Sequence, residues 1–125
     1  MADTAAIAAS LILAGLGLFQ AALAFGTPLG RFAWGGQNER LPLGLRAASA
    51  MTIPIYALIA IVLHDRAGVV EMLPDDAARI GAWVVVGYFV LGVGMNAVSR
   101  SRPERMVMTP VALLLAVLAA IVAAS

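Results

Sequence analysis

The chain has 125 residues, the length of a single domain. Hydrophobic residues make up 62% of it and charged residues 12%, against roughly 45–50% and 25% in soluble proteins, which excludes a water-soluble fold. Cysteine is absent, which excludes disulfides, iron–sulfur clusters and thiol catalysis. All eight basic residues are arginines, and seven acidic residues nearly balance them, which argues against a nucleic-acid interface.

Four segments are apolar over the length of about 20 residues that a membrane-spanning helix needs. We predict these transmembrane helices at about residues 5–26, 45–63, 80–99 and 107–124. We interpret the first as a retained helix and not as a signal peptide, because the residues before it carry Asp3 and no positive charge. The expected fold is all-α: a four-transmembrane-helix bundle forming a single membrane domain over residues 1–125.

The arginines are distributed unevenly between the loops. The loop between the second and third segments contains Arg66 and Arg79. The other two loops contain Arg31, Arg40, Arg100, Arg102 and Arg105, and Arg46 lies at the far edge of the first of them. Since basic residues in short loops mark the cytoplasmic side, we predict that both termini face outward. The expected location is the bacterial inner (cell) membrane, which the chain would cross several times.

Polar side chains on the predicted helices gather near the loops that carry six arginines. Helical spacing of 100° per residue places them on faces rich in small residues, which we expect to point inward. We predict a cavity open to the cytoplasm, with Tyr56 and Tyr88 at its floor and Trp34 near its mouth. The candidate ligand-binding residues are Gln20, Trp34, Ser49, Thr52, Tyr56, Tyr88 and Asn96. The alternative is that these groups only join helices through hydrogen bonds of about 0.6 kcal/mol each.

The arginines near this cavity have two alternative roles. The candidates for binding anionic headgroups are Arg31, Arg46, Arg100 and Arg102. Alternatively, they only set the topology and extend to the membrane interface. Glu104 lies four residues after Arg100, and we expect this pair to neutralise part of the local charge.

The sequence offers little catalytic or metal-binding chemistry. No predicted span carries an acidic or basic residue at its centre, so proton coupling through an embedded carboxylate is not expected. His64 is the only histidine and does not form a metal site by itself. We expect no enzyme, no metal and no cofactor; the loop acids Glu39 and Glu104 are the only candidates for an enzymatic role.

Two stretches together resemble an uncharacterised family of small bacterial four-helix integral membrane proteins. Residues 26–36 follow the pattern GxPxGxFAWGG, and residues 96–105 follow the pattern NxxSxSxxER. The family usually has Trp where this chain has Leu29. The resemblance covers nearly the whole chain and implies a shared design of these loops, with no activity attached. The positions that it marks are Trp34, Asn96, Arg100 and Glu104.

The function that these observations favour is binding, or passive passage, of a small amphipathic molecule or lipid at a cytoplasm-facing pocket. The alternative is a non-transporting scaffold or accessory subunit of a larger membrane complex. Besides the lipid bilayer, the expected partner is a second copy of the chain. Four short helices bury little by themselves, so we expect a homodimer packed through Gly and Ala faces.

Overall fold

The computed structural model describes residues 1–125 and is all-α. Two short 3₁₀ segments, η1 (Gly30–Phe32) and η2 (Trp34–Gly36), interrupt the first loop. The four helices are α1 (Ala2–Ala24), α2 (Leu43–Arg66), α3 (Asp75–Ala97) and α4 (Arg102–Ala123). Each is long and apolar enough to cross a membrane, which confirms the predicted helix number and class.

The start of α4 differs most from the predicted spans, because this helix begins at Arg102 and not near residue 107. Ser101 is its N-cap, and the Ser101 Oγ accepts a hydrogen bond from the Glu104 backbone N–H at 3.4 Å. Pro103 lies in the first turn, where a proline costs no helical hydrogen bond. Glu104, expected in a loop, therefore lies on a helix.

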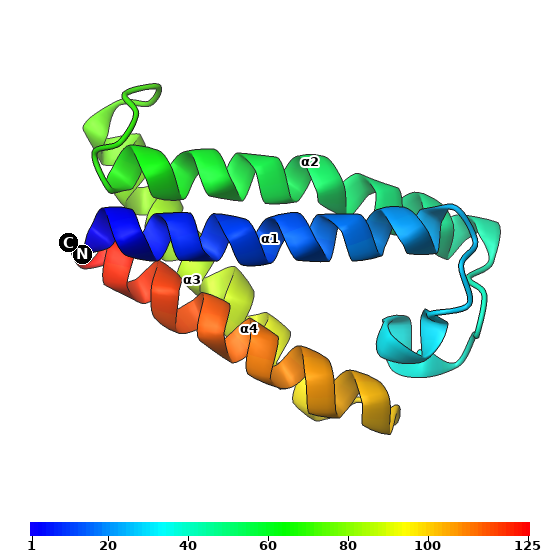
Figure 1. The fold of residues 1–125 in the computed structure, drawn as a ribbon. Coiled ribbons are helices and arrows are strands. Elements are labelled where there is room, and N and C mark those ends of the chain that lie inside the picture. The colour runs from blue at the N-terminus through cyan, green and yellow to red at the C-terminus, as the bar shows by residue number, and fades with distance from the viewer.

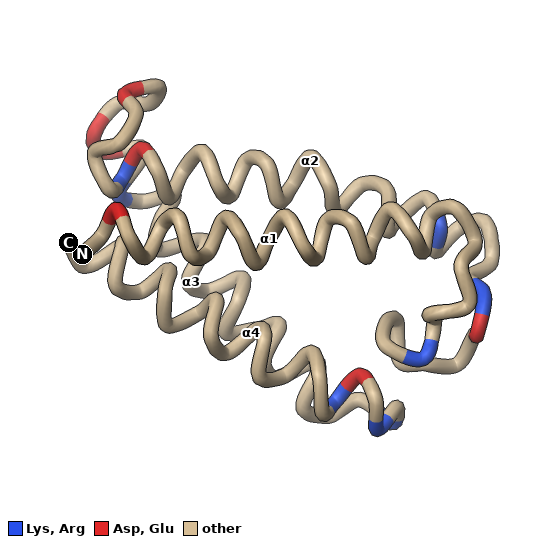
Figure 2. The backbone as a smooth tube through the Cα atoms, viewed as in Figure 1, with Lys and Arg blue, Asp and Glu red and all other residues tan.

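The helices form two hairpins, α1 with α2 and α3 with α4 (Figure 1). The hairpins meet at the end that carries both termini, which we call the terminal end. They diverge toward the opposite end, where η1 and η2 lie between them. Basic residues, blue in Figure 2, gather at this opposite end, which we call the arginine end. Its arginines are Arg31, Arg40, Arg46, Arg100, Arg102 and Arg105.

The hydrophobic core fills the terminal end. Ala6, Ala9, Ala82 and Ala119 are fully buried there, and such small side chains let helices approach closely. Larger apolar residues complete the core, namely Leu13, Ile59, Val62, Leu63, Val85, Phe89, Leu115 and Val122. The hairpins are therefore joined by close packing at one end only.

Polar contacts also connect elements at the terminal end. Ser10 Oγ lies 2.9 Å from His64 Nε2, so the only histidine joins α1 to α2. The Arg66 guanidinium donates to the backbone oxygens of Ala123 and Ser125, the latter at 2.7 Å. The hydrogen bonds from Arg66 satisfy carbonyl groups that the end of α4 leaves without helical partners.

The outward surface of the bundle is apolar. Leu11 and Leu18 on α1 and Val84 on α3 are between 64% and 75% exposed, and water would solvate such an apolar surface poorly. Several glycines also face outward: a Cβ added to Gly15, Gly87 or Gly94 would meet nothing within 4 Å. These glycines take no part in packing within the chain, and the expected homodimer stays a prediction.

Candidate functional site

A cavity of about 590 Å³ lies in the arginine half of the bundle. Side chains from all four helices and from both 3₁₀ segments line it, and 16 of its 23 lining residues are hydrophobic. Its size lies within the range of about 300–1,000 Å³ that is usual for small-molecule sites. Beyond Tyr56 and Tyr88 the packed core of the terminal end begins.

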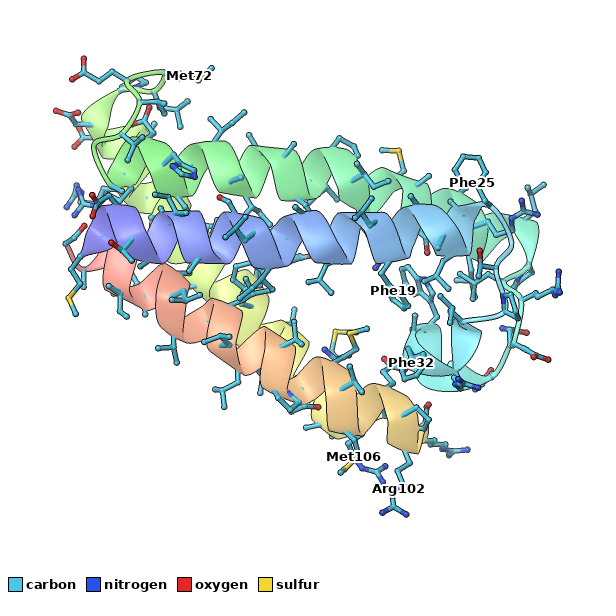
Figure 3. The ribbon with its side chains drawn as sticks, viewed as in Figure 1. Phe19, Phe25, Phe32, Met72, Arg102 and Met106 are labelled. Atoms are coloured by element: carbon cyan, nitrogen blue, oxygen red, sulfur yellow. The ribbon has the colours of Figure 1, made fainter.

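The structure brings six of the seven predicted ligand-binding residues to the lining of this one cavity. They are Gln20, Trp34, Thr52, Tyr56, Tyr88 and Asn96. Figure 3 shows Phe19 and Phe32, two further lining residues, in the space between α1 and α4, whereas Arg102 points away from it. The structure shows that the six predicted residues line one cavity, whereas their role in binding a ligand stays a prediction.

Gln20 and Thr109 each have a buried side-chain oxygen without a hydrogen-bond partner, and of the two only Gln20 lines the cavity. Its Nε2 donates to the Tyr56 hydroxyl over a long 3.4 Å, while its Oε1 is buried and has no partner in the chain. Leaving a buried acceptor unsatisfied costs about 1–3 kcal/mol. A water molecule or a ligand could donate a hydrogen bond to Gln20 Oε1 and so remove this cost, because no donor in the chain does so.

Ser49 has a different position from the other six residues. It is fully buried and does not line the cavity; its Oγ accepts a hydrogen bond from the Trp34 Nε1 at 2.9 Å. Thr52 Oγ1 in turn donates to the Ser49 backbone oxygen at 2.7 Å. For Ser49 the structure therefore favours the packing interpretation, because its hydroxyl holds the Trp34 indole against α2.

The backbone of the 3₁₀ segments is unusual at three successive residues. Trp34 has φ +52°, a left-handed conformation that is uncommon outside glycine, and Gly35 and Gly36 have φ +80° and +71°. A Cβ at Gly36 would overlap the Ser101 side chain, so the loop approaches α4 closely. For Trp34, the one residue of the three that is not glycine, this conformation costs about 1–3 kcal/mol and persists where surrounding contacts fix it.

Glu104 makes one of the contacts that hold this loop. Its Oε2 accepts hydrogen bonds from the Gly35 N–H at 2.9 Å and from the Ser99 Oγ at 3.0 Å. The side chain is only 7% exposed, and it is the only charged residue that lines the cavity. The expected pairing with Arg100 is absent, since the ion pairs of the structure are Met1–Asp3 and Arg79–Asp76.

Sequence reasoning missed the place of Glu104 in the cavity, although one local signal was available. Ser101 and Glu104 form an S-x-x-E pattern, which is typical of a helix N-terminus. Recognising it would have moved the start of α4 to Arg102 and placed the carboxylate on the helix. Its contact with Gly35 has no such local signal.

The arginines predicted to bind headgroups divide into two groups. Arg46 Nε donates to the Ala24 backbone oxygen at 2.8 Å and so satisfies a carbonyl at the end of α1. Arg100 and Arg102 are exposed, and the exposed Arg31 lies with its guanidinium carbon 5.0 Å from the centre of the Phe32 ring. None of these four residues lines the cavity.

Comparisons with protein-family models, with characterised proteins and with solved structures gave no match to the chain. The function is therefore argued from the geometry of the cavity.

Proposed function

We propose that this protein is a multi-pass integral membrane protein that binds a small amphipathic molecule or a lipid in the cavity at its arginine end. The observation that carries the proposal is the cavity of about 590 Å³, mostly apolar in its lining, next to the buried and unpartnered Gln20 Oε1. We further propose that the arginine end faces the cytoplasm of a bacterial cell, by the distribution of arginines between the loops.

The lining supports an amphipathic ligand over a wholly polar one. An apolar body would replace the lipid tails or water that otherwise contact Phe19, Phe89 and Leu115, and it would gain about 25 cal/mol for each Å² of apolar surface removed from water. A polar group on the same molecule would find Gln20, Asn96 or Glu104. A wholly polar molecule would leave most of the lining without a partner.

Binding is better supported than passage through the bundle. The cavity reaches Tyr56 and Tyr88, and beyond them the buried alanines of the core pack the hairpins together. A path to the terminal end would require these helices to separate. We therefore propose a binding site that is loaded and emptied from the arginine end or from the surrounding lipid.

Native mass spectrometry from mild detergent tests this proposal, using two matched variants of α3. A Cβ at Gly92 lies on the cavity lining and meets only the Ala112 Cβ at 3.9 Å, whereas a Cβ at Gly94 meets nothing within 4 Å and lies off the lining. Gly92→Leu should fill part of the cavity and abolish a co-purifying adduct, while Gly94→Leu should keep it. Equal adducts in all three proteins, or none in the wild type, would contradict the proposal.

A further inference from the structure

The cavity carries a single formal charge, and that charge is negative. Glu104 is the only charged residue among its 23 lining residues. One carboxylate oxygen, Oε2, is used by the Gly35 N–H and the Ser99 hydroxyl, while Oε1 accepts no hydrogen bond from the chain. A buried carboxylate is stable only with a compensating charge or enough hydrogen bonds, so Oε1 is an open position for a donor.

No basic side chain compensates this carboxylate. The ion pairs of the structure are Met1–Asp3 and Arg79–Asp76, and neither involves Glu104. Arg105, the next residue along the chain, donates its Nη1 to the Ser99 backbone oxygen at 3.0 Å, and Arg46 donates to the Ala24 carbonyl. The arginines that give this end of the molecule its positive charge therefore lie outside the cavity lining.

Aromatic rings surround the same space. Of the four Phe, two Trp and two Tyr residues in the chain, all except Phe25 and Trp83 line the cavity. The faces of aromatic rings attract cations electrostatically, most strongly for Trp, when the cation lies within about 6 Å of the ring centre. Rings also provide the apolar contact area that a hydrophobic ligand needs.

We propose that the ligand of this cavity is an amphipathic organic cation, with its positive group at Glu104 and Trp34 and its apolar body among the aromatic and aliphatic side chains. This inference rests on the proposed function, since it names the chemical class of the molecule that the cavity binds. A single carboxylate with an open oxygen, six aromatic side chains and no basic residue in the lining all favour a cation over an anion of the same size.

Tetraphenylphosphonium and tetraphenylborate test this preference, because they have nearly the same shape and opposite charges. Trp34 fluorescence reports binding in the cavity when the other tryptophan, the outward Trp83, is replaced in a Trp83→Phe background. In mild non-ionic detergent, we expect tetraphenylphosphonium to bind at least tenfold more tightly than tetraphenylborate. Empty micelles at the same detergent concentration correct for partitioning of both probes.

Glu104→Gln in the same background separates the charge from the shape of the site. The amide oxygen of glutamine still accepts from Gly35 and Ser99, so the loop should keep its position. We expect this variant to weaken tetraphenylphosphonium binding at least tenfold and to leave tetraphenylborate unchanged or slightly tighter. Glu39→Gln, which removes an exposed carboxylate in the same loop, is the matched control and should change neither.

The possible outcomes separate this inference from the proposed function. Equal affinities for the two probes, or an unchanged cation affinity in Glu104→Gln, would overturn the cation assignment while the cavity remains a binding site. If neither probe changes Trp34 fluorescence and Gly92→Leu also leaves the co-purifying adduct unchanged, the proposed function itself fails. The comparison of the two probes needs only the Trp83→Phe replacement, which lies outside the cavity lining, so a misfolded Glu104 or Gly92 variant does not decide the result.

Discussion

The Glu104 carboxylate accepts a hydrogen bond from the Gly35 N–H at 2.9 Å, across 69 residues of sequence. This contact joins the first turn of α4 to the loop that lies between the two hairpins. A second contact, from the Ser101 hydroxyl to the Arg31 backbone oxygen, joins the same two elements. The hairpins diverge at this end (Figure 1), and these contacts hold the loop, whose Trp34 and Gly35 line the cavity, against α4.

Removing this carboxylate should loosen the loop. Glu104→Ala leaves the Gly35 N–H without its acceptor, and the loss of such a hydrogen bond should cost about 1–3 kcal/mol of stability. Hydrogen exchange measured in detergent should become faster at residues 34–36 and remain unchanged in the core around Ala82 and Ala119. Glu39→Ala is the control, and equal exchange in both variants would refute the role of Glu104 in holding the loop.

The hydrogen bond between Trp34 Nε1 and Ser49 Oγ should appear as an energetic coupling. Trp34→Phe and Ser49→Ala should each destabilise the protein, by about 1 kcal/mol for the lost hydrogen bond and by more for Trp34, which also loses ring contacts. Because both variants break the same bond, the double variant should be less destabilised than the sum of the two. Thermal unfolding in one detergent measures all four proteins, and strict additivity would show that the bond contributes nothing.

Arg46 should contribute to stability through the end of α1, not through lipid binding. Its Nε donates to the Ala24 carbonyl, where a positive charge also interacts favourably with the helix dipole. Arg46→Gln should therefore lower stability by about 1–2 kcal/mol. Arg40→Gln, which replaces an exposed arginine of the loop before α2, should have little effect on the unfolding temperature. The same loss in both variants would point to a general effect of charge at this end.

The orientation of the chain can be tested with reporters fused after Ser125. Six arginines at the arginine end predict that the opposite, terminal end lies outside the bacterial cytoplasm. Alkaline phosphatase fused there should be active, and green fluorescent protein exported by the same route should be dark. Fusions after Gly36, in the loop of the arginine end, should give the reverse result. A fluorescent C-terminal fusion would overturn the orientation and the cytoplasmic side of the cavity together.

The sequence alone was sufficient to predict the number of helices and the end of the bundle at which the polar residues and most of the arginines gather. Hydropathy is a local property, and a run of apolar residues about 20 long is unambiguous without any knowledge of its neighbours. The same holds for the uneven distribution of arginines. Helical periodicity also brought Gln20, Tyr56, Tyr88 and Asn96 into one predicted group, and the structure finds all four on the lining of one cavity.

Only the tertiary structure decided which of these polar groups face the cavity and what charge it carries. Ser49 lies on the predicted face of α2, but the Trp34 indole reaches it from the loop and covers it. Glu104 faces the cavity because the loop turns back between the hairpins and offers it the Gly35 N–H. Both outcomes depend on contacts between residues far apart in the chain, and local spacing does not encode such contacts.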